Sequence, residues 1–352
     1  MPPYIHDFAF TEEDNSQVRG RLELEQPLPY QINNQGSGFY RPGRLILEGF
    51  SSLEVVLYHN PATEAFMYLR EARPAQNLCE IIGLTPPSGP CSLPGQLCLG
   101  AERAKLIEQA MIGVFHSPEM RRTLAPYEQQ NLAVFPIARE GLKYQVAEAL
   151  YNNFGFFCDE IVLDAHHVFD SSVPVYNRKV EMTIFKDKDL DAIQRDHIHV
   201  AFLADSIASG LVMKETIKHV KKRFAHIQRI EVIAPLATIR GLSRIAREET
   251  PDDIPVRLHC FETLLNALPP DYYYSAHFDI PELHIRPELE EAYRRWWGQD
   301  AQGNQIADTA CAGYGWSEVF YSPRKQIQMI NSQLQTRHNL TITDIIQRNL
   351  AE

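Results

Sequence analysis

Apolar runs alternate with helical patterns through the middle of the chain, from about residue 101 to residue 247. Strands are predicted at 131–137, 159–165, 197–204 and 229–236, where the sequence reads NLAVFPI, DEIVLDA, HIHVAFLA and RIEVIAPL. A helix is predicted between the first two strands, over GLKYQVAEALYNNF (141–154). Strands that alternate with helices in this way predict an α/β fold, with a mostly parallel sheet flanked by helices.

The segment HIHVAFLADSIASGLVMKETIKHVKKRF, residues 197–224, joins the third strand to a helix. One face of that helix carries Met213, Ile217, Val220 and Phe224. Ser209 and Gly210 therefore lie at its amino end, where free backbone N–H groups and the helix dipole favour a phosphate. Asp205 would repel the same phosphate and should face sugar hydroxyls instead. The pattern predicts a sugar-phosphate site, and a strand-to-helix turn with no ligand is the alternative.

Residues 1–100 are rich in turn formers, such as NNQGSG, RPGR and TPPSGPCSLPGQ, with strand-like runs RLILEG and SLEVVLYH between them. We interpret them as an accessory β-containing region without catalytic candidates. The core is predicted over 101–250, followed by an insert, cap and C-terminal segment over 251–352. The aromatic-rich stretch 251–305 is a possible docking surface for a protein partner, and packing over the sheet is the alternative.

The composition excludes several classes of protein. With 352 residues, 44% of them hydrophobic, the chain has the material for a large globular core. No apolar window is long enough to span a membrane, and the first residues do not resemble a secretion signal, so we expect a cytoplasmic protein. The net charge of −11 argues against general nucleic-acid binding. The six cysteines form no Cys-x-x-Cys pair, which favours free thiols.

Three segments together resemble a known family. VAFLADSIASG resembles the phosphoribosyl pyrophosphate (PRPP) motif of type I phosphoribosyltransferases. VFPIAREGLKYQVAEAL resembles the pyrophosphate loop of the uracil phosphoribosyltransferase branch, and RIEVIAPLATIRGLSRI resembles a later strand and helix start of that branch. The three occur in the family's order within residues 101–250. The resemblance implies the type I phosphoribosyltransferase fold, binding of PRPP or a nucleotide, Mg²⁺ as cofactor and a homodimer.

The resemblance also implies a role for each matching residue. Asp205 would bind the ribose 2- and 3-hydroxyls and Arg139 the pyrophosphate, which makes these two the catalytic candidates. The substrate-binding candidates are Ala208, Ser209 and Gly210 at the 5-phosphate, Glu140 and Gly141 at the pyrophosphate, Ala237, Thr238 and Gly241 at the base end, and His167 in a mobile loop. We expect residues 166–173 to form that loop and to close over the site, which excludes water.

The chain also departs from the family. Ala204 stands at the first of the two acidic positions of the PRPP motif, and Leu211 and Val212 replace small or hydroxyl residues of the phosphate loop. GYGW (313–316) is a faint counterpart of the stretch that reads uracil, with Trp316 in place of aspartate. These differences indicate a nitrogen acceptor other than uracil. They also leave open a catalytically inactive subunit that senses PRPP or a nucleotide and docks a partner, or a structural subunit with an empty site.

Two further patterns have simpler interpretations. His166 and His167, with Asp164 and Asp170 nearby, could hold a metal, but adjacent loop histidines are more often solvated, and we assign no metal ligands. The basic run KHVKKRF is interpreted as a solvated helix face.

Overall fold

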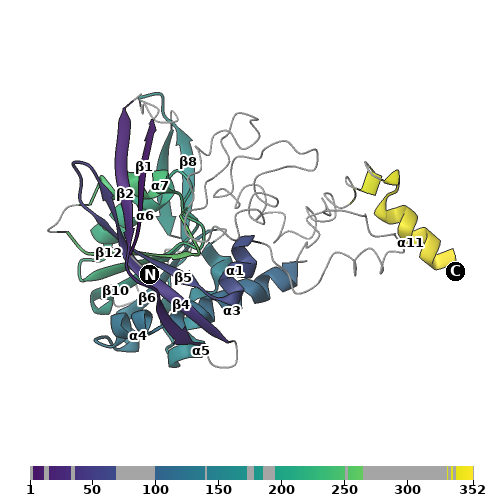
Figure 1. Cartoon of the computed structure of the whole chain (residues 1–352), viewed down its shortest axis with the longest axis horizontal. Coiled ribbons are helices and arrows are strands. Elements are labelled where there is room, and N and C mark those ends of the chain that lie inside the picture. Colours follow the sequence, from purple (N-terminus) through teal and green to yellow (C-terminus); the bar gives the residue numbers. More distant parts are fainter. Residues whose placement is uncertain are drawn as a thin grey trace.

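The computed structural model describes residues 3–11, 16–32, 36–68, 100–138, 141–172, 178–184, 195–249, 253–264, 331, 334–335 and 338–351. Its strands are β1 (Tyr4–Thr11), β2 (Gln17–Leu24), β3 (Leu28–Gln31), β4 (Ser37–Leu47), β5 (Leu53–His59), β6 (Leu132–Ala138), β7 (Asp159–Glu160), β8 (Leu163–Phe169), β9 (Arg178–Ile184), β10 (Val200–Ala204), β11 (Arg229–Ile233) and β12 (Val256–Phe261). Its α-helices are α1 (Pro61–Tyr68), α3 (Gly100–His116), α4 (Pro118–Leu124), α5 (Val146–Phe154), α6 (Leu211–Arg223), α7 (Ile239–Ala246) and α11 (Ile342–Ala351), as Figure 1 shows. Short 3₁₀ helices are η2 (Gln129–Asn131), η3 (Gly141–Tyr144) and η5 (Arg195–His197).

The centre of the fold is a run of parallel strands in the order β8-β6-β10-β11-β12-β5. Numbered from β6 along the chain, without β5, the two-residue β7 and the antiparallel β9, this order is 2-1-3-4-5, which is one of the doubly wound arrangements. The direction in which strands are added reverses between β6 and β10. The predicted α/β fold with a mostly parallel sheet is confirmed. β10, β11, α5 and α6 form within the segments expected from the sequence, whereas β6 ends one residue later and β8 runs from Leu163 to Phe169, four residues beyond the expected strand at 159–165.

The first strands of the chain extend this same sheet. β5 pairs in parallel with β12, and β4 pairs antiparallel with β5. β1 and β2 continue the antiparallel edge beyond β4. Both predicted boundaries, near residues 100 and 250, therefore fall between strands of one sheet.

Each face of the sheet is covered by helices, because the central strands are apolar on both sides. Along β10, Phe202 packs with α1, α3, α4 and α5 on one face, whereas Leu203 packs with α6 and α7 on the other. All five residues of β10 are completely buried. Such continuous apolar strands are typical of parallel sheets with helices on both faces. Among the described helices, none is long and apolar enough to cross a membrane.

Opposite charges alternate from strand to strand across the half of the sheet in which the parallel strands begin. Directly opposed positions on successive strands hold Glu23, Arg44, Glu54, Arg257 and Glu231. Arg257 donates to Glu54 at 2.8 Å and to Glu119 of α4 at 2.5 Å. Opposed pairs of opposite charge each contribute about 0.2–1 kcal/mol, and a shifted register would place like charges together. The row therefore helps to fix the strand register.

A buried hydrogen-bond network connects β5, β12 and β11. His259 Nε2 lies 2.5 Å from a carboxylate oxygen of Glu231, and His259 Nδ1 lies 2.8 Å from the hydroxyl of Tyr58. Arg229 pairs with the other oxygen of Glu231. Burial acts to raise the pKa of Glu231, but the hydrogen bond and charge of His259 and the charge of Arg229 outweigh it and lower that pKa. The carboxylate is therefore ionised inside the core.

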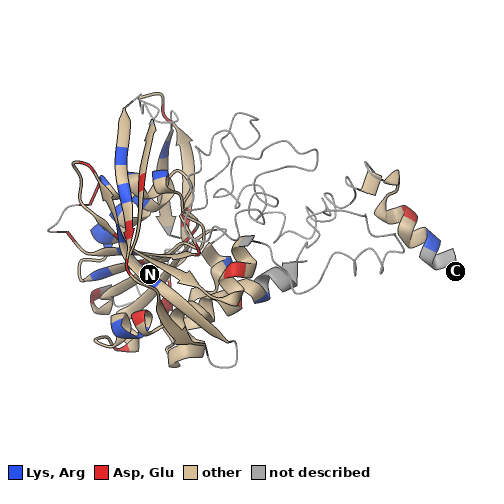
Figure 2. Ribbon diagram, viewed as in Figure 1, with Lys and Arg blue, Asp and Glu red and all other residues tan. Residues whose placement is uncertain are grey.

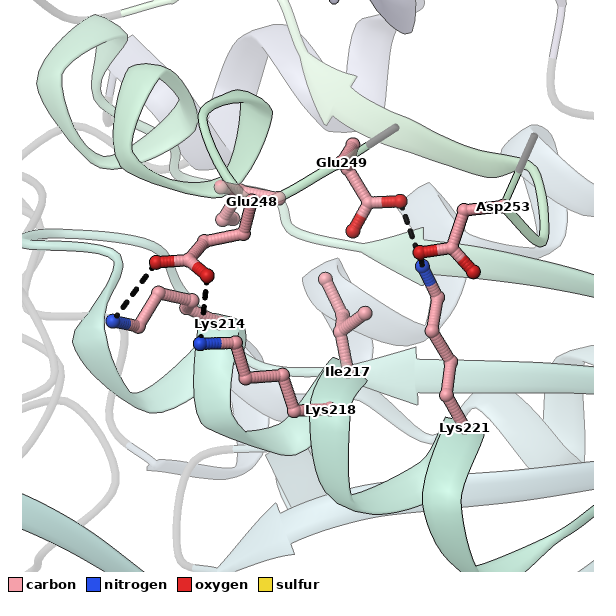
Figure 3. A pocket seen from close by; sticks show the side chains of 8 residues that line it. Lys214, Ile217, Lys218, Lys221, Glu248, Glu249 and Asp253 are labelled. Atoms are coloured by element: carbon pink, nitrogen blue, oxygen red, sulfur yellow. Dashed lines mark hydrogen bonds and ion pairs between the residues drawn. The ribbon is translucent and has the colours of Figure 1, made fainter. Parts of the chain in front are cut away.

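Three lysines of α6 form ion pairs with the segment after α7, as Figure 3 shows. The pairs are Lys214–Glu248 at 3.5 Å, Lys218–Glu248 at 2.7 Å, Lys221–Glu249 at 2.7 Å and Lys221–Asp253 at 2.9 Å. The basic run is thus not simply a solvated face, because Lys221 is only 14% exposed and connects α6 to the approach to β12. Elsewhere basic and acidic residues are interspersed over the described elements (Figure 2).

We expect His259→Ala to lower the free energy of unfolding by about 3 kcal/mol at neutral pH, because it removes a partner from a buried charge. The folded-state pKa of Glu231 lies below its usual value of 4.5, so the network stabilises the fold above that pH and loses its effect as the pH falls through the folded-state value. Urea unfolding over a pH series measures both effects. His226→Ala is the control, because His226 is 56% exposed in a weak pair with Asp196. Equal losses in the two variants would contradict a stabilising role for the buried network.

Candidate functional site

The point where the strand order reverses, between the carboxyl ends of β6 and β10, is where doubly wound sheets bind ligands. The chain after β10 carries Asp205 to Gly210, and the chain after β6 resumes in the described structure at Gly141. A Cβ on Gly141 would lie 1.9 Å from the carbonyl oxygen of Ala204. The two loops therefore meet through their backbones, and only glycine permits the contact.

The β10–α6 turn is fastened to the β11–α7 turn. Ile207 forms an isolated parallel bridge with Ala237, and Thr238 N–H donates to the Ile207 carbonyl at 2.9 Å. The Thr238 hydroxyl donates to the Ala208 carbonyl at 2.5 Å and accepts from Gly241 N–H at 2.8 Å, which caps α7. One side chain thus fixes both turns, so the amino ends of α6 and α7 are adjacent.

Gly210 lies at the closest approach of these turns. Its φ of +78° is left-handed, and a Cβ would meet the Gly241 carbonyl oxygen at 2.3 Å. A Cβ on Gly241 would in turn meet the Ala208 carbonyl oxygen at 2.4 Å. Backbone on both sides cannot move away as a flexible side chain can. Glycine is therefore required here for both conformation and space.

The prediction that α6 begins just after Ser209 and Gly210 is confirmed. Its first backbone bond runs from Lys214 N–H to the Gly210 carbonyl at 2.9 Å, and Leu211 N–H donates weakly to the Ser209 hydroxyl at 3.3 Å. Within the described part of the chain, no hydrogen bond engages the N–H groups of Ser209, Gly210 or Val212. Such amides and the helix dipole make this end of α6 favourable for an anion.

A buried arginine lies against this turn and was not anticipated from the sequence. Arg244 of α7 is 8% exposed and donates from Nη1 to the Ser209 carbonyl at 2.6 Å. Its charge adds to the positive end of α6. Arg240 is equally buried and lies over the ring of Phe10, 4.9 Å from its centroid. The sequence signal was weak, because a helix with arginine every fourth residue is typical of many surface helices.

Tyr144 connects the two sides of the site and was also missed. It lies in η3, is fully buried, and shares a hydrogen bond between its hydroxyl and Ser206 Oγ. Asp205 is half-buried, with its N–H donating to the Ile233 carbonyl at 3.3 Å. Asp205 and Ser206 are thus held from below by β11 and from the side by η3.

The remaining candidates are placed less centrally. Arg139 and Glu140 lie outside the described residues. His167 is exposed within β8, opposite Val180 of β9, and not on a loop. The expected closing loop over 166–173 is therefore wrong for its first half: β8 continues to Phe169 because β9 pairs with it along its whole length.

Among the described residues, these histidines do not form a metal cluster. His166 Nε2 instead pairs with Asp164 at 3.0 Å, and the described residues contain no group of three or more histidine, cysteine or acidic side chains able to hold an ion. Asp170 accepts hydrogen bonds from Ser172, which lower the pKa of its carboxyl group. The GYGW stretch and most of 251–305 lie outside the described residues.

Among the comparisons with known proteins, only the one with solved structures finds similarity. No protein-family model matches the chain, and no curated protein does. Among solved structures, it is similar to a hypothetical protein from Neisseria gonorrhoeae with bound ppGpp, at 12% identity and a TM-score of 0.31, over 55% of this chain and 92% of that one. It is also similar to adenine phosphoribosyl transferase from Trypanosoma brucei, in complex with AMP, pyrophosphate and ribose-5-phosphate, at 12% identity and a TM-score of 0.31, over 61% of this chain and 94% of that one. Similarity this low assigns neither ligand nor activity to this chain, and the uracil branch stays a prediction.

We expect Gly210→Ala to destabilise the fold at least twice as much as Gly155→Ala. Both glycines have a left-handed φ, which costs about 1–2 kcal/mol for alanine. A Cβ on Gly155 has nothing within 4 Å, whereas one on Gly210 would overlap the Gly241 backbone. Urea unfolding of both variants isolates the cost of the overlap. Similar losses would show that the two turns can move apart at little cost.

Proposed function

We propose that this protein binds PRPP or a ribose 5-phosphate nucleotide and transfers the phosphoribose to a nitrogen of an acceptor other than uracil. The observation that carries the proposal is the turn at Ala208, Ser209 and Gly210, with open amides at the amino end of α6, where the strand order reverses. A half-buried carboxylate, Asp205, precedes it. This combination fits a ligand that has a phosphate and a sugar.

The anion is supported by three sources of positive potential. The N–H groups of Ser209, Gly210 and Val212 have no hydrogen bond among the described residues, the helix dipole adds to them, and the Arg244 guanidinium lies behind the Ser209 carbonyl. The Ser209 hydroxyl adds a donor once it turns from Leu211 N–H, to which its bond is long at 3.3 Å. A phosphate here would therefore be neutralised without a lysine in the turn.

The sugar is supported by the position of Asp205. It follows the last residue of β10 directly, so its carboxylate belongs to the same strand-end turn as the phosphate site. Carboxylates accept from two hydroxyls at once, which matches the 2- and 3-hydroxyls of ribose. Its anchoring through Ile233 and the adjoining Ser206–Tyr144 bond would keep the sugar in one orientation.

Mg²⁺ fits this donor set as a metal that arrives with the substrate. Mg²⁺ is usually held by one or two carboxylates together with substrate phosphates and water. Asp205 is the carboxylate in place, and the described residues form no all-protein metal cage. When bound, the ion would neutralise pyrophosphate charge, while Asp205 would hold the ribose side.

The transfer itself needs little acid or base chemistry. The bond from C1 to the pyrophosphate oxygen breaks and the oxygen keeps the electron pair. The acceptor nitrogen bonds to C1 from the other face and releases its N–H proton to water. The chain would contribute fixed amides and charges that hold both ends of the ribose phosphate. Arg139 as the pyrophosphate ligand, like the homodimer and the partner surface at 251–305, stays a prediction.

A second candidate, a catalytically inactive PRPP or nucleotide sensor, is favoured by one observation. The side chain of Ala204, at the first acidic position of the resembling motif, is completely buried and packs in the core below α5. Its carbonyl also closes against Gly141. A second carboxylate has no space there, so binding without turnover is a coherent alternative.

We expect wild-type protein to bind PRPP in the presence of Mg²⁺, and Asp205→Asn to weaken that binding by about tenfold or more, or about 1.4 kcal/mol. The reason is that an amide lacks the charge and the second acceptor oxygen of the carboxylate. Isothermal titration calorimetry measures the change. Asp196→Asn is the matched control, because the Asp196 side chain is 91% exposed and lies on η5.

Absence of PRPP binding, or equal affinities for the two variants, would contradict the proposal. Pyrophosphate release with a panel of nitrogen bases then separates the two candidate functions. Release with any base supports the transferase, and PRPP binding without release supports the sensor.

A further inference from the structure

A second polar site also lies at the carboxyl ends of the parallel strands. It includes His59, which belongs to residues 1–100, where the sequence offered no catalytic candidate. His59 is the last residue of β5 and Glu262 directly follows β12, and these strands are parallel neighbours. His59 Nδ1 lies 3.0 Å from Glu262 Oε2, and both side chains are completely buried. The other carboxylate oxygen accepts from the Thr63 hydroxyl at 2.7 Å. Histidine and glutamate are thus paired at the carboxyl end of the sheet.

The other ring nitrogen of this histidine is unsatisfied. Within the described residues, His59 Nε2 is buried without a hydrogen-bond partner. Buried polar atoms nearly always have partners, so an exception requires an explanation, such as a functional role or an unseen bound group. In a neutral imidazole, a carboxylate at Nδ1 holds the proton there, which leaves Nε2 as an acceptor. The pair therefore presents a hydrogen-bond acceptor that lacks its donor.

The surrounding backbone and rings hold the pair rigidly. Glu262 has a φ of +59°, a left-handed conformation that is costly for a residue with a side chain and is concentrated at functional sites. Its N–H donates to the Tyr58 carbonyl at 3.0 Å. The ring of Phe39 stacks on His59 with centroids 4.3 Å apart. The direction of Nε2 is therefore fixed before any ligand binds.

The position of the pair matches the acceptor side of the proposed reaction. Three strand spacings separate β10 from β5, which is about 14 Å at roughly 4.8 Å each. Displacement at a sugar carbon brings the nucleophile to the face opposite the leaving group. The predicted pyrophosphate loop follows β6, on one side of β10. The acceptor should then approach from the other side, over β11, β12 and β5.

We propose that the carboxyl ends of β12 and β5 bind the nitrogen acceptor, which donates a hydrogen bond from a ring N–H or amino group to His59 Nε2. Glu262 is a positioning residue, because it acts only through the imidazole. The inference rests on the proposed function and adds the acceptor's chemical class: a flat nitrogen heterocycle with a donor on the edge far from the ribose. An acceptor edge that carries only acceptors would face the Nε2 lone pair and be rejected.

Two substitutions of His59 separate this role from a structural one. His59→Asn places an amide N–H where Nδ1 was, so the bond to Glu262 persists while Nε2 is removed. His59→Gln extends an amide towards the Nε2 position. The probes are ribose 5-phosphate, which has no base, and AMP, IMP, GMP and CMP, which carry N–H donors on their bases. Calorimetry measures the affinity of the wild type and both variants for each probe.

We expect at least one nucleotide to bind the wild type more tightly than ribose 5-phosphate does, and to lose about tenfold or more in affinity with His59→Asn and less with His59→Gln. Ribose 5-phosphate should bind all three proteins equally. An undiminished affinity for every nucleotide, or an equal loss for ribose 5-phosphate, would overturn the inference. Failure of ribose 5-phosphate to bind the wild type would instead defeat the proposed function itself.

A measurement on the unsubstituted protein keeps the test open if the variants do not fold. The ¹⁵N resonance of His59 Nε2 should have the position of an unprotonated nitrogen and should shift when a nucleotide binds, but not when ribose 5-phosphate binds. An Nε2 resonance that no bound nucleotide moves would overturn the assignment.

Discussion

The backbone contact between Gly210 and Gly241 is the constraint on which the candidate site depends. It brings the first turn of α6 against the first turn of α7, where Thr238 is bonded to both turns. A side chain at Gly210 or Gly241 would overlap the backbone of the other turn. Within the described residues, the N–H groups of Ser209, Gly210 and Val212 in this tightly packed turn have no hydrogen-bond partner. Close packing of backbone on one side thus creates unmet hydrogen-bonding capacity on the other.

Two buried pairs of histidine and glutamate lie at different depths from the carboxyl ends of the strands. The Glu231–His259 network lies within the sheet, and the Glu262–His59 pair lies one step nearer the carboxyl ends of the same strands. In the lower network every oxygen of the carboxylate is engaged and the imidazole is bonded at both nitrogens. The upper pair has the same chemistry but one nitrogen left over. The comparison explains why the first serves stability and the second is a candidate for binding.

The sequence predicted the fold and the strand-to-helix turn at the candidate site, because the signals for both are local. Strand and helix periodicity is carried by adjacent residues, so β10, α6 and the turn at Ser209 and Gly210 were accessible from the pattern alone. Tyr144, Arg244 and His59 could not be identified from the pattern. Each of them contacts a residue more than thirty positions away in the sequence. His166 and His167 were predicted to lie on a loop, but they lie in β8. This part of β8 is stabilised by pairing with β9 and not by a run of apolar residues, so the sequence pattern did not indicate a strand there.

The pairing of β5 with β12 has a consequence for how the chain can be divided. A fragment that starts near residue 100 would keep α3 and all the strands from β6 onward, yet β12 would lose β5, one of its two neighbours. Exposed rows of N–H and C=O groups on an apolar strand recruit other chains. Such a truncated protein would be prone to self-association in solution. In the full chain, β5 covers this edge of β12 and prevents such pairing.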